Sequence, residues 1–176
     1  MSLGLLKSLK RPSGYNQGGI LGVLAIPTLL PTGARGFEVT RTADEPTNIV
    51  PAQGNAFQLI EPEENTCAFA ENLKVGANRY LNQTISFKYG SLSNLTAVGM
   101  KALNLGRHSF LVKLKNNTCV LLGENNGLTA EKNDGGAGAT NDDLAGYDLT
   151  LSGGEIVHAA VFPASVFDTL AVAVAD

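Results

Sequence analysis

The sequence predicts a mostly β, antiparallel domain with one α-helix, and three stretches carry this prediction. Residues Arg79 to Tyr89 alternate apolar and polar side chains, the period of two that a strand with one buried face requires. Residues 92–105 instead place leucine, valine and alanine at steps of three and four, which is the spacing of one helix face. Two apolar runs within 107–122 flank Asn116-Asn117, which tolerates positive φ and predicts an antiparallel hairpin.

The first half of the chain predicts short strands separated by residues that break regular structure. Residues 1–17 contain Pro12-Ser13-Gly14 and scattered lysines, so we expect a flexible arm there. Residues 20–26 are almost entirely apolar and predict a buried strand, while Pro27 and Pro31 predict a loop over 28–35. The other segments expected before residue 79 are strands at 36–41, 56–60 and 66–70, an irregular stretch at 44–53, an acidic turn at 61–65 and a connection at 72–78.

The second half surrounds the predicted helix with further strands. Ser91 is the expected N-cap of this helix, and Gly106 stands where a left-handed C-terminal residue is favoured. A low-complexity loop of small residues is predicted at 133–143. Further strands are expected at 107–115, 119–122, 128–132 and 147–152, and apolar β-like segments, ambiguous because alanine is abundant, at 156–162 and 166–174. We expect residues 18–176 to form a single domain with a C-terminal extension at 156–176.

The composition bears on how this domain meets other molecules. Charged residues make up 16% of the 176 residues, against roughly 25% in an average soluble domain. Either another subunit covers part of the surface, or Gly, Asn and Thr keep a β surface soluble, and composition favours neither. The net charge is −3, and the basic residues cluster only at Lys7, Lys10 and Arg11, so no phosphate-binding stripe is predicted. Slight acidity would suit a surface past which nucleic acid slides without adhering.

The two cysteines and the longest apolar run are both expected in strands. Cys67 and Cys119 are too few for a disulfide framework or a four-cysteine zinc site, and we expect both thiols to be buried. The apolar run at 18–30 is interrupted by Gly22 and Pro27 and is shorter than the ~20 residues that a membrane span needs. A buried first strand is favoured over the core of a signal peptide, so we expect an unprocessed chain and no membrane partner.

No stretch of the sequence carries a recognisable catalytic motif. His108 and His158 are the two histidines, and neither stands at a motif spacing from a carboxylate or a nucleophile. A pair of His108 with Cys119 across the predicted hairpin is geometrically conceivable, but nothing in the sequence selects it. The glycine-rich loop lacks the Lys-Ser/Thr ending of a phosphate loop, and its aspartates depart from the calcium-loop spacing. The sequence therefore predicts no catalytic, cofactor-binding or metal-binding residues, and a protein that is not an enzyme.

The order of several segments resembles a known group of virion proteins. The first of these segments is Gly18-Gly19-Ile20, where the similarity is loose. The next is the predicted strand at 79–89, which leads into the helix. The remaining segments are Leu103-Asn104-Leu105-Gly106-Arg107, Leu122-Gly123-Glu124-Asn125-Asn126-Gly127-Leu128, the small-residue loop, and residues 141–155. In this order they resemble tail structural proteins of tailed bacteriophages, in particular the major tail tube proteins of phages of gut Bacteroidetes and Firmicutes. The resemblance covers 79–155 well and 18–70 loosely.

The resemblance implies a β-sandwich or partial β-barrel with one flanking helix. It also implies that six copies close into a ring and that stacked rings conduct DNA, so the partners would be further copies, other tail proteins, and DNA as passing cargo without sequence-specific binding. The implied location is the phage tail of the virion, after synthesis in the cytoplasm of the host bacterium. By resemblance, residues 41–53 and 133–143 are contacts between rings, and the arm at 1–17 lies against an adjacent ring.

Two departures from the resemblance leave other functions open. The loop with Pro27 and Pro31 and the extension at 156–176 do not match, which keeps a tail terminator, a hub or a capsid-decorating protein in view. A cell-surface β-sandwich module that binds carbohydrate or peptide is the alternative from another class. The chain has no Trp and four tyrosines, of which Tyr89 is expected to face the core, so a sugar-stacking surface is hard to assemble.

Overall fold

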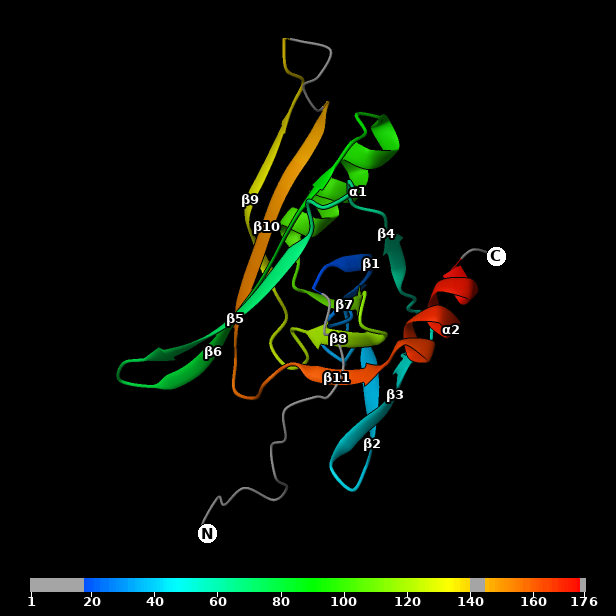
Figure 1. Cartoon of the computed structure of the whole chain (residues 1–176), viewed down its shortest axis with the longest axis vertical. Coiled ribbons are helices and arrows are strands. Elements are labelled where there is room, and N and C mark those ends of the chain that lie inside the picture. Colours follow the sequence, from blue (N-terminus) through cyan, green and yellow to red (C-terminus); the bar gives the residue numbers. More distant parts are fainter. Residues whose placement is uncertain (1–17, 140–144, 175–176) are drawn as a thin grey trace.

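A computed structural model describes residues 18–139 and 145–174, which form eleven strands and two helices. All strand pairs are antiparallel, as predicted, and they form a five-stranded sheet, a four-stranded sheet and a separate hairpin. Figure 1 shows the arrangement. The sheets do not close into a barrel, and their arrangement is consistent with the β-sandwich that the resemblance implies. The predicted arm at 1–17 lies outside the described residues.

The two main sheets draw their strands from distant parts of the chain. In spatial order, the five-stranded sheet contains β11 (Ala160–Pro163), β8 (Thr118–Leu122), β7 (His108–Leu114), β1 (Ile20–Pro27) and β4 (Gln58–Ile60). The four-stranded sheet contains β5 (Ala68–Val75), β6 (Arg79–Tyr89), β10 (Gly146–Glu155) and β9 (Thr129–Gly136). The separate hairpin contains β2 (Phe37–Thr42) and β3 (Glu45–Pro51), and the helices are α1 (Asn94–Leu105) and α2 (Ala164–Val174).

The hydrophobic core occupies both faces of the five-stranded sheet. One cluster fills the space between the two large sheets and includes Val23, Phe87 and Phe110. The second cluster covers the opposite face, where Phe37 of β2 and Phe167 of α2 pack against the sheet. Residues of β1 belong alternately to the two clusters, which explains why this strand is apolar at successive positions instead of alternating. Neither helix is long and apolar enough to cross a membrane, a finding that covers residues 18–139 and 145–174.

Strand β6 confirms the clearest prediction from the sequence. Leu81, Ile85 and Phe87 are buried, and the intervening residues are half-buried or exposed, apart from the buried polar Gln83. The register with β10 runs without interruption from Tyr89 opposite Tyr147 to Leu81 opposite Glu155. This continuous register fixes which side chains of both strands point inward, because a shift of one residue would turn every side chain to the other face.

Helix α1 confirms the predicted helix but corrects both of its ends. Ser93, not Ser91, is the N-cap, and its hydroxyl accepts a hydrogen bond from the Thr96 amide at 3.1 Å. Gly106 ends the helix in an extended conformation, with φ −128°, so the predicted left-handed residue is wrong. Chain direction decides this end: Gly106 leads directly into β7, which leaves no room for a left-handed reversal.

Strand β3 replaces the irregular stretch predicted at 44–53. Ala43 and Asp44 both have positive φ, at 50° and 66°, which is the combination that closes a tight hairpin with β2. Pro46 and Pro51 lie opposite Arg41 and Phe37 within this two-stranded sheet. Each strand of such a hairpin pairs on one side alone, so a proline whose nitrogen faces the open side removes no ladder hydrogen bond.

Helix α2 replaces the β-like segment predicted at 166–174, so the described chain has two helices and not one. Ala164 and Phe167 are buried, and Leu170 and Ala171 pack against the second cluster. Their spacing of three to four residues is that of a helix face, and alanine favours a helix strongly enough to offset the valines.

Several strands have other bounds than those predicted, and the largest differences are in β5, β9 and β11. Strand β5 continues to Val75, through part of the connection expected at 72–78, because β6 pairs with it up to the turn. Strand β9 continues to Gly136, into the loop expected at 133–143, because β10 pairs with it. At Gly135 a Cβ atom would lie 2.8 Å from the Tyr147 ring, so glycine is needed in a strand here. The segment expected at 156–162 forms a strand only from Ala160, as β11.

Candidate functional site

The first notable feature is a loop that connects the two large sheets. Residues 123–128, here called the junction loop, link β8 of one sheet to β9 of the other. Gly123 and Gly127 both have positive φ, at 70° and 72°. Such angles favour glycine, so the sequence Gly-Glu-Asn-Asn-Gly specifies the shape of this loop.

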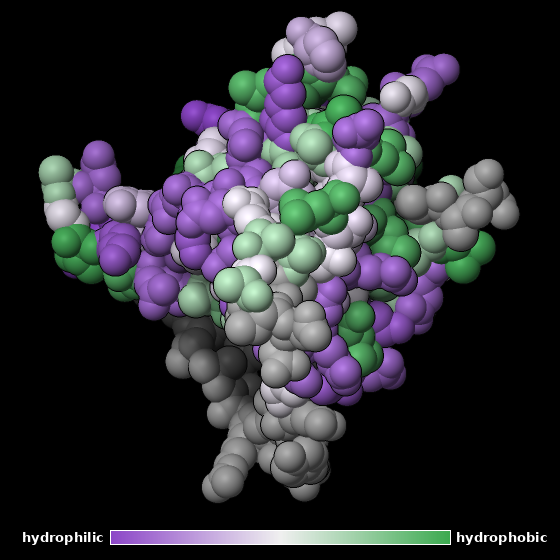
Figure 2. All heavy atoms as spheres, turned by 90° about the horizontal axis from the view of Figure 1, so that it is seen from above, coloured by the Kyte–Doolittle hydropathy of each residue, from purple (hydrophilic) through white to green (hydrophobic). Residues whose placement is uncertain are grey.

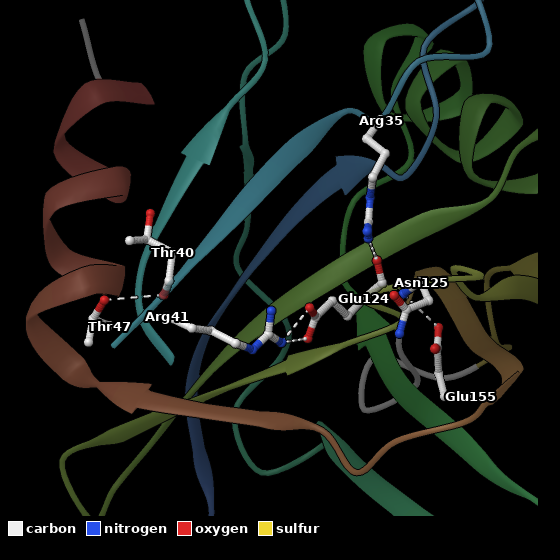
Figure 3. Close-up of polar contacts among 7 residues, drawn as sticks. All are labelled: Arg35, Thr40, Arg41, Thr47, Glu124, Asn125 and Glu155. Atoms are coloured by element: carbon white, nitrogen blue, oxygen red, sulfur yellow. Dashed lines mark hydrogen bonds and ion pairs between the residues drawn. The ribbon is translucent and has the colours of Figure 1, made fainter. Parts of the chain in front are cut away.

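The β2–β3 side of the molecule is attached to the junction loop by arginines (Figure 3). The Arg41 guanidinium donates to both carboxylate oxygens of Glu124, at 2.5 and 2.7 Å, and Arg35 donates to the Glu124 carbonyl. The Glu124 side chain is only 8% exposed, so its charge requires this partner. The ion pair therefore fixes the β2–β3 hairpin against the junction loop.

A buried carboxylate holds the junction loop from the other side. Glu155, at the end of β10, is 1% exposed, and one of its oxygens accepts from the amides of Asn125 and Asn126 at 3.1 and 2.7 Å. The Asn126 side chain donates in turn to the Gly154 carbonyl at 2.7 Å. Two backbone amides in the loop thus obtain a charged acceptor without solvent.

Gln83 connects the junction loop to the inward face of β6. Its side-chain oxygen accepts from the Gly123 amide at 2.8 Å, and its amide donates to Glu71 of β5 at 2.8 Å. On the other side of the loop, the Ser109 hydroxyl donates to the Gly123 carbonyl at 2.6 Å and lies 2.8 Å from the Thr28 hydroxyl. This chain of buried polar groups joins both sheets, and its members are engaged with one another and not directed toward a cavity.

Glu71 also fixes the segment that leads into β11. Its carboxylate accepts from the Ala159 amide at 2.8 Å and contacts the ring of His158. Burial raises the pKa of the Glu71 carboxyl, but the hydrogen bonds from Ala159, His158 and Gln83 outweigh it, so the pKa lies below its ordinary value. The folded state therefore binds a proton here less readily than the unfolded chain does.

We expect this contact to make stability dependent on acidic pH. Because the pKa of Glu71 is lowered on folding, its contribution is complete above the ordinary value of 4.5 and is lost as the pH falls through the folded value. Glu71→Gln should therefore lower the free energy of unfolding by about 1–2 kcal/mol at pH 7, with a smaller loss at pH 3. Urea titrations at both pH values measure this. Glu38→Gln, at an exposed position, is the control, and an equal loss at both pH values would contradict the assignment.

The residues that might have supplied chemistry are far apart or unreactive. His108 is buried on the face of β7 shared with Phe110, whereas Cys119 belongs to the cluster on the opposite face, so the conceivable Cys–His pair is wrong. Burial raises the pKa of Cys67 to about 12 and that of Cys119 to about 11, which keeps both thiols protonated at neutral pH. Burial also lowers the pKa of His108.

Of the three aspartates of the predicted small-residue loop, Asp134 lies within the described residues. Asp134 lies in β9, where the Lys132 ammonium is 3.7 Å away and also bonds Asp148 at 2.7 Å. The other two aspartates, at 142 and 143, lie outside the described residues. Within the part of the chain that the structure describes, no three His, Cys, Asp or Glu side chains gather as metal ligands.

The second notable feature is the hairpin formed by β5 and β6. It bends away from the sandwich, on the left of Figure 1, and residues 72–80 around its turn are all exposed. Leu73, Val75 and Tyr80, here called the hairpin tip, are 61%, 66% and 43% exposed. Figure 2 shows hydrophobic and hydrophilic atoms side by side on this projecting arm. A projecting hairpin with partly exposed apolar side chains is suited to contact another molecule.

The third notable feature is an apolar groove beside α1. The groove has a volume of 520 Å³ and lies between α1 and β4, with Tyr89 and His108 also in its wall. Leu59, Leu95 and Val98 line it and are 42%, 84% and 67% exposed. Only Met100 and Leu103 of α1 are buried, so most of this helix presents apolar residues to the surface.

The segments that the resemblance implies as contacts belong neither to the hairpin tip nor to the lining of the groove beside α1. Residues 41–53 form most of the β2–β3 hairpin, but Ile49 is buried in the protein's own second cluster. Residues 133–139 include the end of β9, where Asn133 bonds the Asn104 side chain of α1 at 2.7 Å. Sequence reasoning missed the hairpin tip, although apolar Leu73 and Val75 alternate with polar residues in the segment predicted as a connection.

Comparisons with protein-family models, with curated protein sequences and with solved structures find no match to this chain. Its function is therefore inferred from the junction loop, the hairpin tip and the sheet edges of the fold.

Proposed function

We propose that the protein is a structural subunit of a phage virion, most specifically a tail tube subunit that assembles with further copies of itself into stacked rings. The observation that carries this proposal is the projecting β5–β6 hairpin, whose tip leaves Leu73, Val75 and Tyr80 61%, 66% and 43% exposed. Single exposed apolar residues are ordinary, but three on one projecting arm favour a partner that covers them.

Open sheet edges support the same proposal. Strands β5 and β9 are the edges of one large sheet, and β11 and β4 are the edges of the other. Unpaired edges can add a strand from a neighbour, and pairing between identical copies in a closed ring would protect them. The low content of charged residues, 16%, also suits a surface of which copies cover a large part.

The polar residues of the described chain favour a scaffold over an enzyme. Glu71, Gln83, Glu124 and Glu155 bond partners within the fold, and both thiols are held protonated by burial. The junction loop that these residues hold joins the two sheets, and a rigid junction suits a subunit that must transmit load through an assembly.

Assembly of purified protein tests this proposal. The full chain should form rings or tubes of uniform diameter as its concentration rises, followed by light scattering and electron microscopy. The double variant Leu73→Ser/Val75→Ser should raise the concentration required by about tenfold or more, because each subunit loses two apolar contacts. Val172→Ser on α2, which is 67% exposed, is the control and should assemble normally.

The outcomes separate the alternatives. Single rings that do not stack would favour a tail terminator or a hub over a tube subunit. A chain that stays monomeric at every concentration and binds a glycan would contradict the proposal and favour the cell-surface binding module. Normal assembly of the Leu73→Ser/Val75→Ser variant would show that the hairpin tip is not an interface, even if tubes form.

A further inference from the structure

The groove beside α1, here called the α1 groove, is a mainly apolar recess of the surface. Leu95 and Val98 of α1 line one side, Leu59 of β4 lines the other, and all three are exposed. Its volume of 520 Å³ falls within the roughly 300–1,000 Å³ that is usual for sites that hold apolar groups. Lys101, the one charged residue of α1, is not among the residues that line it. Such a groove lowers its free energy when apolar side chains fill it.

An acidic stretch adjoins the α1 groove. Ile60, the last residue of β4, lines the groove and is followed by exposed glutamates at positions 61, 63 and 64, here called the acidic run. The Glu63 amide donates to the Lys88 carbonyl at 2.8 Å. The acidic run therefore lies beside the end of β6, whose last residue, Tyr89, also lines the groove. Its three carboxylates outnumber the one ammonium of Lys88, so an occupant of the groove should combine apolar side chains with basic ones.

The hairpin tip has this combination. Leu81 of β6 lies opposite Leu73 and is buried, so Leu73 belongs to the core-facing side of the four-stranded sheet, although it is itself exposed. Val75, two residues further along β5, shares that side with Arg79, which lies opposite it. Lys74 is also exposed and adds a second basic group at the tip. The core-facing side of this hairpin thus continues past the sandwich, apolar and flanked by positive charge.

We propose that the hairpin tip of one copy lies in the α1 groove of a second copy, with Leu73 and Val75 against α1 and the basic residues Lys74 and Arg79 beside the acidic run. The groove of the same chain is out of reach, because the hairpin projects to the left in Figure 1 whereas α1 and β4 lie to the right. Apolar side chains on both surfaces lose contact with water in this arrangement, and charges of opposite sign meet at its edge.

This contact is head-to-tail, since each copy would contribute its tip to one interface and its groove to another. A head-to-tail contact either closes into a ring or continues as an open filament. The inference rests on the proposed function in one respect, the association of copies with one another, and it names the two surfaces that meet.

Disulfide formation between two different variants tests the contact in the full-length protein. In a Cys67→Ala background, one variant carries Val75→Cys at the tip and the other carries a single cysteine in the groove, at Leu95, Val98 or Ala102. Cys119 stays in both variants, because it is fully buried. One variant has a tag, so that mixed dimers have their own size on non-reducing gels. On oxidation, at least one of the three mixtures should form mixed dimers about tenfold faster than either variant alone forms dimers.

A control mixture and the state of assembly separate the outcomes. Val172→Cys on α2, which is 67% exposed, replaces the groove cysteine in the control and should give mixed dimers about tenfold more slowly. Rings or tubes without faster mixed dimers in any mixture would overturn this contact and leave the proposed function standing. Mixed dimers from a protein that forms only open filaments would support the contact and contradict the tube. Absence of both mixed dimers and association would overturn both.

A charge exchange tests the placement of the basic residues. Lys74→Glu/Arg79→Glu in the tip variant should slow the formation of mixed dimers by about fivefold, the effect of one or two exposed ion pairs. Glu61→Lys/Glu63→Lys in the groove variant should restore the rate. Each rate is divided by the rate at which the same tip cysteine reacts with a small neutral disulfide, because a neighbouring charge also changes the reactivity of the thiol.

The same change of charge elsewhere is the control for this exchange. Glu38→Lys/Asp44→Lys alters two exposed acidic residues of the β2–β3 hairpin and should not restore the rate. An unchanged rate in the tip variant, or equal restoration by the β2–β3 variant, would overturn the placement of the basic residues beside the acidic run.

Discussion

Replacing Gly127 by alanine should lower the free energy of unfolding by about 3 kcal/mol or more. Gly127 has a φ of 72°, where an L side chain is strained, and an added Cβ would lie 2.3 Å from the Thr28 hydroxyl oxygen. That hydroxyl is itself buried beside Ser109, so it has no room to withdraw. The same Cβ would be 3.0 Å from the Cβ of Arg107, so two elements would have to move.

Gly33→Ala separates the two causes of this loss. Gly33 also has a positive φ, 82°, but an added Cβ would have nothing within 4 Å. Gly33→Ala should therefore lower the free energy of unfolding only by the cost of the strained backbone conformation, about 1 kcal/mol. Urea unfolding of both variants, followed by circular dichroism, gives the comparison. Equal losses would mean that the junction loop relaxes around the added methyl group and does not rigidly connect the sheets.

Gln83→Leu should lower the free energy of unfolding by about 2–4 kcal/mol, even though leucine suits an inward position on β6. The side chain of Gln83 is 1% exposed and supplies the acceptor for the Gly123 amide and a donor for Glu71. Leucine would leave a buried amide without an acceptor and a carboxylate with one fewer donor. The lost hydrogen bonds of Gln83 therefore cost more free energy than the burial of the leucine side chain contributes.

Hydrogen exchange and a surface control make the Gln83 experiment specific. The Gly123 amide should exchange faster in Gln83→Leu by a larger factor than amides in the middle of β6. Gln53→Leu, at an exposed position, should change the free energy of unfolding by less than about 0.5 kcal/mol. If Gln83→Leu is as stable as the unmodified protein, the buried hydrogen bonds of Gln83 with Gly123 and Glu71 contribute no net stability.

The sequence was sufficient to predict a strand or helix where a single residue pattern determines that element. In β6 the alternation from Leu81 to Phe87 follows directly from one buried and one exposed face, so strand and inward residues are both correct. Half-buried Tyr89, which packs against the first core cluster, also agrees with the expectation. Helix α1 was found from its spacing, but the N-cap was misplaced by two residues because Ser91 and Ser93 offer the same hydroxyl, and local sequence does not choose between them.

Strands and helices that depend on partners distant in the sequence could not be predicted from their own residues. The extension of β9 through Gly135 and Gly136 requires β10 beside it, and Gly-Gly without a known partner is typical of a loop. Helix α2 is recognisable only once Phe167 has the second cluster to pack against, since valine and alanine alone permit either structure. The polar chain through Gln83 was missed because a single polar residue on an apolar face gives no sequence signal of its partners.

The position of β10 inside the four-stranded sheet has a consequence for synthesis of the chain. Strands β6 and β9 both pair with β10, which is translated after them and ends at Glu155. While the chain grows, β6 exposes Ile85 and Phe87 and offers an unpaired edge, because β5 is its only partner already made. This sheet therefore cannot be completed until β10 has been synthesised, and until then the open edge of β6 favours aggregation of the growing chain.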